Sequence, residues 1–177
     1  MRIAAAQCWS APLDVPRNLE TIARLAAEAA DAGARLVVFP ELFLSGVAYV
    51  PRLWELAPVA GDATERRLAG LARQHRLHLV VGTAERRDSH LYNTALLVAP
   101  DGHLRRYTKL HLFSLDAFVF RPGAGPVVWE TALGRIGVGI CYDMLFADPW
   151  ERYAGAVDLV TVPSAWPEFA GAVTNVF

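Results

Sequence analysis

Residues 35–40 read RLVVFP, a run of β-branched and other apolar side chains that ends at a proline. Such a run predicts a buried strand. Residues 2–8, RIAAAQC, are also small and apolar with little helical period, and they predict a second short buried strand. Between these strands, leucine, isoleucine and alanine recur at helical spacing from a cap at Asn18 to a stop at Gly33. A strand–helix–strand order favours parallel pairing through a right-handed crossover, so this stretch predicts an α/β fold.

The rest of the chain adds antiparallel strands to this beginning. Pro100-Asp101-Gly102 provides turn residues between two extended runs and predicts a hairpin, and Leu133-Gly134 does the same farther along. We expect helices over residues 64–75 and 149–154, and strands over residues 77–83, 91–99, 103–109, 127–131, 135–140 and 158–162. The sheets are therefore predicted to be mixed.

The composition indicates one folded domain. The 177 residues are 54% hydrophobic and 20% charged, which allows a buried core. A net charge of -1 argues against nucleic acids and membrane surfaces as partners. The two cysteines, Cys8 and Cys141, form no CxxC or Cys/His cluster, so neither a disulfide framework nor a zinc site is supported. Because no export signal or run of about 18 apolar residues occurs, we expect a cytoplasmic protein without a membrane span.

Cys141 lies in GVGICYD, directly after a glycine-rich strand and directly before an expected helix. A turn at this position pushes the side chain outward, and nearby backbone N–H groups and the helix N-terminus favour a thiolate and a developing oxyanion. We therefore interpret Cys141 as a candidate nucleophile. A buried structural cysteine is the alternative, and it is our interpretation of Cys8.

Glu41 and Lys109 are the candidate partners of the nucleophile. Glu41 follows RLVVFP at the C-terminal end of a strand, where α/β sheets build their sites, and a carboxylate there suits a general base. Lys109 ends the strand RRYTK and precedes LHLF, so an amine lies among apolar residues. Taken singly, each charge could equally be an ordinary strand-end residue. Of the histidines, His111 has the most promising neighbourhood, whereas the other four border loops or a helix end: His75, His78, His90 and His103.

Three motifs in this order, FPELFLSG around Glu41, YTKLHLF around Lys109 and GICYDMLF around Cys141, resemble the nitrilase superfamily. The members of this superfamily, the carbon–nitrogen hydrolases, carry a glutamate, a lysine and a cysteine in the same order. The segments RIAAAQ, LYNTALLVAPDG, FRPG, WETALGRIGVGIC and VDLVTVPSAWP are similar as well. The resemblance therefore covers nearly the whole chain.

This resemblance implies a nitrilase-like αββα sandwich with mixed sheets. It implies that Glu41 is a general base, that Cys141 attacks an amide or nitrile carbon, and that Lys109 and the Tyr142 backbone N–H stabilise the oxyanion. Water then hydrolyses the thioester, and the reaction requires no metal or organic cofactor. The expected activity is hydrolysis of a non-peptide carbon–nitrogen bond in a small amide or N-carbamoyl substrate. The expected assembly is a homo-oligomer.

The sequence departs from the family pattern in two places. Members often carry a second glutamate four residues before the phenylalanine of FRPG, and this chain has Asp116 there. Asp116 is therefore either a shorter residue for binding substrate and lysine or an ordinary loop residue. The resemblance ends near Pro167, so we expect an incomplete carbon–nitrogen hydrolase domain over residues 1–167, with its C-terminal portion missing, and an atypical tail over 168–177.

Two other functions stay open at this level. A truncated nitrilase-like chain without a closed pocket would be a non-catalytic subunit or pseudoenzyme. An acyl transferase would use the same thioester, but the sequence offers neither a membrane segment nor an evident acceptor site for it.

Overall fold

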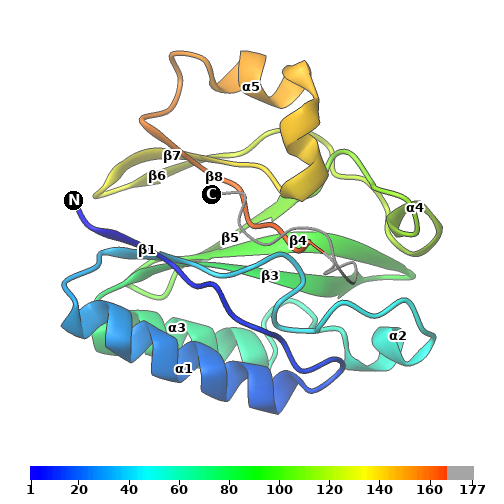
Figure 1. The fold of residues 1–177 in the computed structure, drawn as a ribbon, viewed down its shortest axis with the longest axis horizontal. Helices are drawn as coiled ribbons and strands as arrows, with labels where there is room; N and C mark the ends of the chain where they lie inside the picture. Colours follow the sequence, from blue (N-terminus) through cyan, green and yellow to red (C-terminus); the bar gives the residue numbers. More distant parts are fainter. Residues whose placement is uncertain (167–177) are drawn as a thin grey trace, which may run out of the picture.

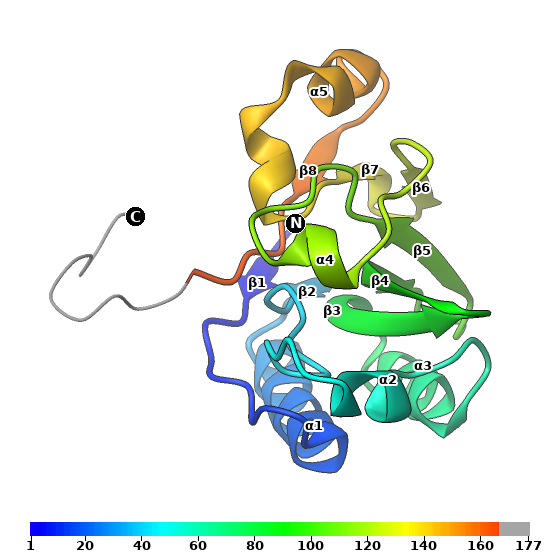
Figure 2. The same cartoon turned by 90° about the vertical axis from the view of Figure 1, so that its right-hand side faces the viewer.

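The computed structural model describes residues 1–166, and the expected tail over 168–177 lies outside them. Two β-sheets pack face to face. Helices α1 (Val15–Asp31) and α3 (Ala63–His75) cover the outer face of one sheet, and α5 (Ala147–Tyr153) covers the other (Figure 1). The same layers are seen from the side in Figure 2. The order helix, sheet, sheet, helix confirms the predicted αββα architecture.

The first sheet has five strands in the order β1-β2-β3-β4-β5. They are β1 (Ile3–Ala5), β2 (Leu36–Val38), β3 (His78–Arg87), β4 (His90–Val98) and β5 (Leu104–Thr108). The β1–β2 and β2–β3 pairs are parallel, whereas β3–β4 and β4–β5 are antiparallel. The parallel beginning, the hairpin and the mixed sheet are confirmed. Strand β3 runs past its predicted end at Thr83, because the charged residues that follow continue the pairing with β4.

Helix α1 begins at a different cap from the predicted one. The Asp14 side chain accepts a first-turn backbone N–H at 3.1 Å, so Asp14 is the N-cap. Asn18 lies inside the helix, buried, and its amide donates to the main-chain oxygens of Ala11 at 2.8 Å and Leu44 at 3.0 Å. The prediction of Asn18 as the cap was therefore wrong, because this side chain turns inward to hold two loops. The predicted stop is correct, since Gly33 follows the helix with a φ of 79°.

Strand β1 is less buried than predicted. Ile3 is 40% exposed and Ala5 is also exposed. Among the described residues β1 pairs only with β2, so its outer edge contacts no other described strand. The small apolar composition of this segment is compatible with pairing, but it did not establish that the strand is covered.

The second sheet has three strands, β6 (Val128–Thr131), β7 (Gly134–Val138) and β8 (Leu159–Thr161), in that order. The β6–β7 pair is antiparallel and the β7–β8 pair is parallel, as the predicted hairpin and the intervening helix α5 require. A 3-10 helix over Cys141–Leu145 follows β7. This helix and the short helices α2 (Arg52–Leu56) and α4 (Asp116–Val119) were not delimited from the sequence, because four or five residues show no reliable period.

Apolar side chains fill both spaces next to the first sheet. The core under α1 and α3 includes Ile22, Ala26, Leu68, Leu79 and Val81, and the core between the sheets includes Leu36, Val80, Leu97, Trp129 and Ile136. Since both faces of β2 and β3 are covered, these strands read as continuous apolar runs. The loops after β2, β5 and β7 carry the candidate site residues. None of the helices formed by residues 1–166 is both long and apolar enough to cross a bilayer.

Candidate active site

Glu41 lies in the tight turn that follows β2. The turn is fastened to β3, because the Phe39 N–H donates to the Val80 carbonyl at 2.8 Å and the Leu44 N–H to the Gly82 carbonyl at 2.9 Å. Only a glycine fits at position 82, since a Cβ there would lie 2.7 Å from the Glu41 Cα. The Glu41 residue is 4% exposed. The turn therefore holds a carboxylate inside the protein at the carboxyl end of the strand.

Lys109 follows β5 and is buried between two carboxylates. Its Nζ donates to Glu41 Oε1 and to Asp116 Oδ2, each at 2.6 Å. Burial opposes the charged ammonium, but the two anions outweigh burial and raise the pKa of Lys109. Lys109 is therefore held as a cation. With two carboxylates around one ammonium, this charge cluster is negative overall.

Cys141 occupies a strained turn between β7 and the 3-10 helix. Its φ of 43° lies in the left-handed region, which costs a residue other than glycine about 1–2 kcal/mol. The Cys141 N–H donates to the Pro163 carbonyl at 3.0 Å, which anchors the turn to the segment after β8. The charges of Glu41 and Lys109 both act on the Cys141 thiol. The structure thus brings the three predicted catalytic residues together.

The surroundings of the Cys141 thiol disfavour its ionisation. Burial, reinforced by Glu41, raises the pKa of Cys141 to about 12, although Lys109 acts in the opposite direction. A backbone N–H, that of Ala165, does lower the pKa of Cys141, but the net shift is opposite to the predicted preference for a thiolate. Desolvation and the adjacent carboxylate outweigh the ammonium and the backbone N–H, so the resting group is a neutral thiol.

Asp116 is the first residue of α4, and its carboxylate is buried. It binds Lys109 through Oδ2 and accepts a hydrogen bond from the Tyr49 hydroxyl at 2.9 Å through Oδ1. Burial and Asp116 raise the pKa of the Tyr49 phenol, so this residue stays a proton donor. Sequence reasoning missed Tyr49, because it lies in a loop without periodicity. Asp116 and Tyr49 therefore extend the charge cluster that Glu41 and Lys109 form.

Asn93 is a second residue that sequence reasoning missed. It is fully buried on the face of β4 toward the second sheet, and its amide Nδ2 donates to Glu41 Oε1 at 2.8 Å. The Ala165 N–H donates to the other oxygen, Oε2, at 3.1 Å. Glu41 is therefore held at both oxygens. An asparagine at an inward position of the apolar strand LYNTALLV was the available signal.

Tyr142, the predicted oxyanion residue, directly follows the nucleophile in the chain. Its ring packs in an aromatic cluster, 4.9 Å from the Phe113 ring and 5.2 Å from the Phe146 ring between centroids. The Tyr142 side chain is therefore held by aromatic packing.

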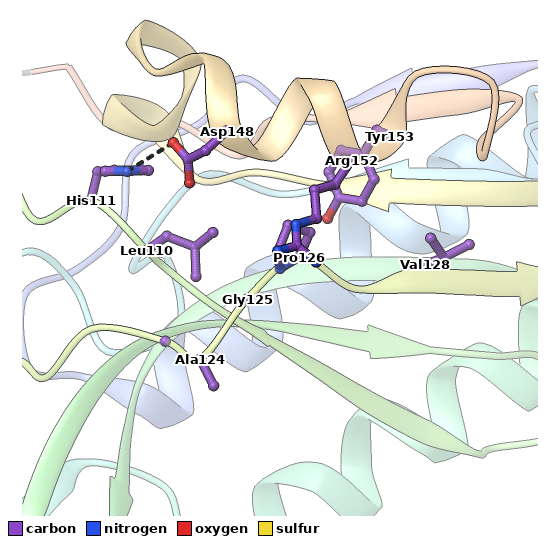
Figure 3. A pocket seen from close by; sticks show the side chains of 10 residues that line it. Leu110, His111, Ala124, Gly125, Pro126, Val128, Asp148, Arg152 and Tyr153 are labelled. Atoms are coloured by element: carbon purple, nitrogen blue, oxygen red, sulfur yellow. Dashed lines mark ion pairs between the residues drawn. The ribbon is translucent and has the colours of Figure 1, made fainter.

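His111 belongs to a different group of side chains. Its Nδ1 lies 3.1 Å from Asp143 Oδ1 and its Nε2 lies 3.2 Å from Asp148 Oδ1. His111, Asp148 and Arg152 line a cleft of about 550 Å³ (Figure 3), and neither Glu41 nor Cys141 reaches that cleft. Within residues 1–166, no group of three or more His, Cys, Asp or Glu side chains is arranged to hold a metal ion. His111 is therefore separate from the charge cluster.

The arrangement has the components of nucleophilic acyl chemistry. A thiol can supply the nucleophile, the carboxylate whose charge acts on it can supply a base, and the buried ammonium bound to that carboxylate can stabilise an oxyanion.

Comparisons with known proteins point to one family. The sequence profile described as carbon-nitrogen hydrolase matches residues 2–168. The chain is 36% identical to the omega-amidase NIT2 of Xenopus tropicalis, covering 84% of this chain and 61% of the relative. It is 35% identical to the nitrilase of Pyrococcus abyssi, covering 93% of this chain and 64% of the relative.

The crystal structure of an amidase from Nesterenkonia sp. superposes with a TM-score of 0.83 at 31% identity, covering 94% of this chain and 65% of that one. This chain therefore spans 61% to 65% of the length of these relatives. The family profile, the sequence identity and the shared fold confirm the predicted resemblance: this chain belongs to the carbon–nitrogen hydrolase family of the nitrilase superfamily.

Proposed function

We propose that this chain hydrolyses a non-peptide carbon–nitrogen bond in a small amide or N-carbamoyl substrate through a thioester at Cys141. The observation that carries the proposal is the buried cluster in which Lys109 Nζ lies 2.6 Å from both Glu41 and Asp116, next to the thiol. Burying two carboxylates and an ammonium costs free energy, and a structural role alone does not require it. A reaction that needs a base and a fixed cation beside one sulfur atom does require such a buried cluster.

In the proposed mechanism, Glu41 takes the Cys141 proton while the sulfur attacks the carbonyl carbon. Lys109 and the Tyr142 N–H stabilise the oxyanion of the tetrahedral intermediate. Glu41 then passes the proton to the departing nitrogen, and ammonia or an amine leaves. Water, deprotonated by Glu41, attacks the thioester, releases the acid and restores the thiol.

The raised pKa of Cys141 is compatible with this mechanism. The thiol is neutral at rest, and in our proposal the carboxylate of Glu41 removes its proton as attack begins. Asn93 and Lys109 both bind Glu41 Oε1, whereas Oε2 accepts one hydrogen bond, from the Ala165 N–H, and we assign the proton transfer to this oxygen. In our proposal Asp116 holds Lys109 in place and does not itself touch the reacting atoms.

Relatives support the reaction class. A structure of the Nesterenkonia sp. AN1 amidase shows Michael addition of acrylamide at the active-site cysteine of that enzyme, and other relatives are omega-amidases by name. Amides are therefore the first substrates to test. Cytoplasmic location and a homo-oligomeric assembly stay predictions.

The test is ammonia release by the 177-residue chain from a panel of short aliphatic amides, N-carbamoyl amino acids and nitriles. We expect release from at least one amide, its complete loss in Cys141→Ala, and unchanged release in Cys8→Ala, the matched control. A folded chain that alkylates at Cys141 but releases nothing across the panel would refute hydrolysis and favour the non-catalytic alternative.

A further inference from the structure

Asp143 is a fully buried carboxylate two residues after Cys141, and it takes no part in the proposed chemical steps. It accepts the Ile140 N–H at the start of the 3-10 helix and has further partners outside that helix. The donors are the Ile140 N–H at 2.9 Å, the Tyr107 hydroxyl at 2.7 Å, the Leu110 N–H at 3.1 Å, the His111 N–H at 2.8 Å and the His111 ring Nδ1 at 3.1 Å. Both oxygens of Asp143 are therefore solvated by the protein.

These donors come from both sheets. Ile140 belongs to the turn that carries Cys141, after β7 of the second sheet. Tyr107 lies on β5 of the first sheet, and Leu110 and His111 directly follow Lys109 at the end of that strand. Asp143 thus joins the loop of the ammonium to the turn of the sulfur across the interface between the sheets.

The remaining contacts of Lys109 do not provide this connection. The Lys109 N–H donates to the Asn93 carbonyl at 2.9 Å and its carbonyl accepts from the Gly123 N–H at 2.9 Å, so its backbone is held by the first sheet and its own loop. The Lys109 side chain binds carboxylates that also follow strands of that sheet. The Ala165 N–H of the segment after β8 also crosses to Glu41 Oε2 at 3.1 Å, whereas Asp143 binds the Lys109 loop itself and joins it to the Cys141 turn.

We propose that Asp143 is a positioning residue, whose ionised carboxylate ties the Lys109 loop to the Cys141 turn and so sets the distance between the oxyanion-stabilising ammonium and the attacking sulfur. This inference rests on the proposed function. Displacements of about 1 Å at a reacting centre cost about 100-fold in rate, so such a bridge matters for turnover.

The bridge requires a carboxylate and not merely a side chain of the same shape. Every partner of Asp143 can donate, and an asparagine would place an NH₂ group against one set of donors. The Tyr107 hydroxyl could rotate to accept from that NH₂, but the backbone N–H groups of Ile140, Leu110 and His111 could not. Asp143→Asn therefore leaves at least one buried N–H unpaired beside the nucleophile or the lysine loop.

The experiment compares Asp143→Asn with Asp158→Asn, which removes an exposed carboxylate that pairs with Arg135 on the same sheet. Both are made in a Cys8→Ser background, so that iodoacetamide reports on Cys141 alone. We measure kcat and KM for the best amide of the panel, and the alkylation rate of Cys141 against pH. The charged groups that face the thiol are Glu41 and Lys109, and Tyr49 is a further titratable neighbour.

We expect Asp143→Asn to lower kcat by about 100-fold with KM changed by less than about threefold. We also expect the alkylation curve to move to higher pH, because the withdrawn ammonium of Lys109 no longer lowers the pKa of Cys141. A merely structural role would reduce the folded fraction and leave the curve of the folded protein in place. Asp158→Asn should change neither quantity.

If Asp143→Asn fails to fold by circular dichroism, Tyr107→Phe decides, because it removes one donor to the same carboxylate without changing the core volume. We expect it to lower kcat by about three- to tenfold and to move the curve in the same direction. Wild-type kcat and an unshifted curve in the folded variants would overturn the positioning role. Absence of ammonia from the wild-type chain would instead refute the proposed function, while the alkylation curves would still test the bridge.

Discussion

Replacing Asp116 with asparagine tests the charge cluster most directly. The carboxylate is buried and 2.6 Å from Lys109 Nζ, so Asp116→Asn removes one of the two anions that neutralise a buried ammonium. An amide can still accept from Tyr49, but its NH₂ group then faces the lysine. Breaking a buried ion pair from one side costs about 3–5 kcal/mol. Because Glu41 stays paired with Lys109, the lower end applies, about 3 kcal/mol or a shift of about 100-fold in the unfolding equilibrium.

Turnover should fall as well. With Asp116 neutral, Lys109 has Glu41 as its single counter-ion, and the tighter pair makes Glu41 a weaker base toward Cys141. We expect ammonia release to fall by about 100-fold, the low end of what acid–base catalysis contributes. Asp116→Glu keeps the charge with one more methylene and should retain activity within about tenfold.

Urea denaturation followed by circular dichroism gives the free energy of unfolding, and the ammonia assay gives turnover. Asp31→Asn, an exposed change of the same kind at the end of α1, serves as the matched control and should stay within about 0.5 kcal/mol. Our reasoning is refuted if Asp116→Asn costs less than about 1 kcal/mol and keeps turnover within about threefold. Asp116 would then be the ordinary loop residue that the sequence left open.

Three further predictions follow from the packing and charges of the site. Gly82→Ala places a Cβ 2.3 Å from the Pro40 carbonyl oxygen, so it should displace the Glu41 turn and lower the melting temperature by about 5–10 °C. Gly70→Ala is the control: this glycine lies on α3 with open space around it, so the change should raise the free energy of unfolding by about 0.5–1 kcal/mol. Because burial raises the pKa of Cys141 to about 12, its alkylation should accelerate by about tenfold per pH unit from pH 8 to pH 11, and a plateau near neutral pH would contradict this reading. Lys109→Met should slow the alkylation of Cys141 at every pH in this range, because it removes an ammonium that lowers the pKa of the thiol. Labelling at the wild-type rate, followed by mass spectrometry, would contradict this role of Lys109.

The fold could be predicted largely from local patterns. RLVVFP, the helix that precedes it and the turn at Pro100-Asp101-Gly102 each carry their own period or turn chemistry, and the structure confirms the elements that they predict. An error arose where two nearby residues were equally suited to the same local role. Asp14 and Asn18 can both cap a helix, and only the position of the Leu44 loop shows that Asn18 turns inward.

The three central residues of the site could be predicted because their motifs occur along the chain in the order typical of the family. Glu41 and Lys109 follow strands of the first sheet and Cys141 follows a strand of the second, and the family motifs indicated that the three residues meet. Asn93 binds Glu41 and Tyr49 binds Asp116, each from a remote position in the chain. These contacts depend on strand register and loop packing, which no short motif encodes. The predicted direction of the pKa shift of Cys141 was wrong for a related reason. The strand–turn–helix pattern around Cys141 predicts backbone dipoles that favour a thiolate, but the sequence does not show how deeply the thiol is buried or how close Glu41 lies to it.

The left-handed backbone of Cys141 has an evolutionary consequence. Glycine adopts this conformation without steric penalty, so a codon change from cysteine to glycine would relieve about 1–2 kcal/mol of torsional strain while abolishing the nucleophile. Along this mutational route the backbone strain favours loss of catalysis, whereas the packing of the Cys141 side chain against the core between the sheets and selection for turnover oppose it. Descendants that retain the fold without the chemistry should carry glycine at this position more often than chance predicts.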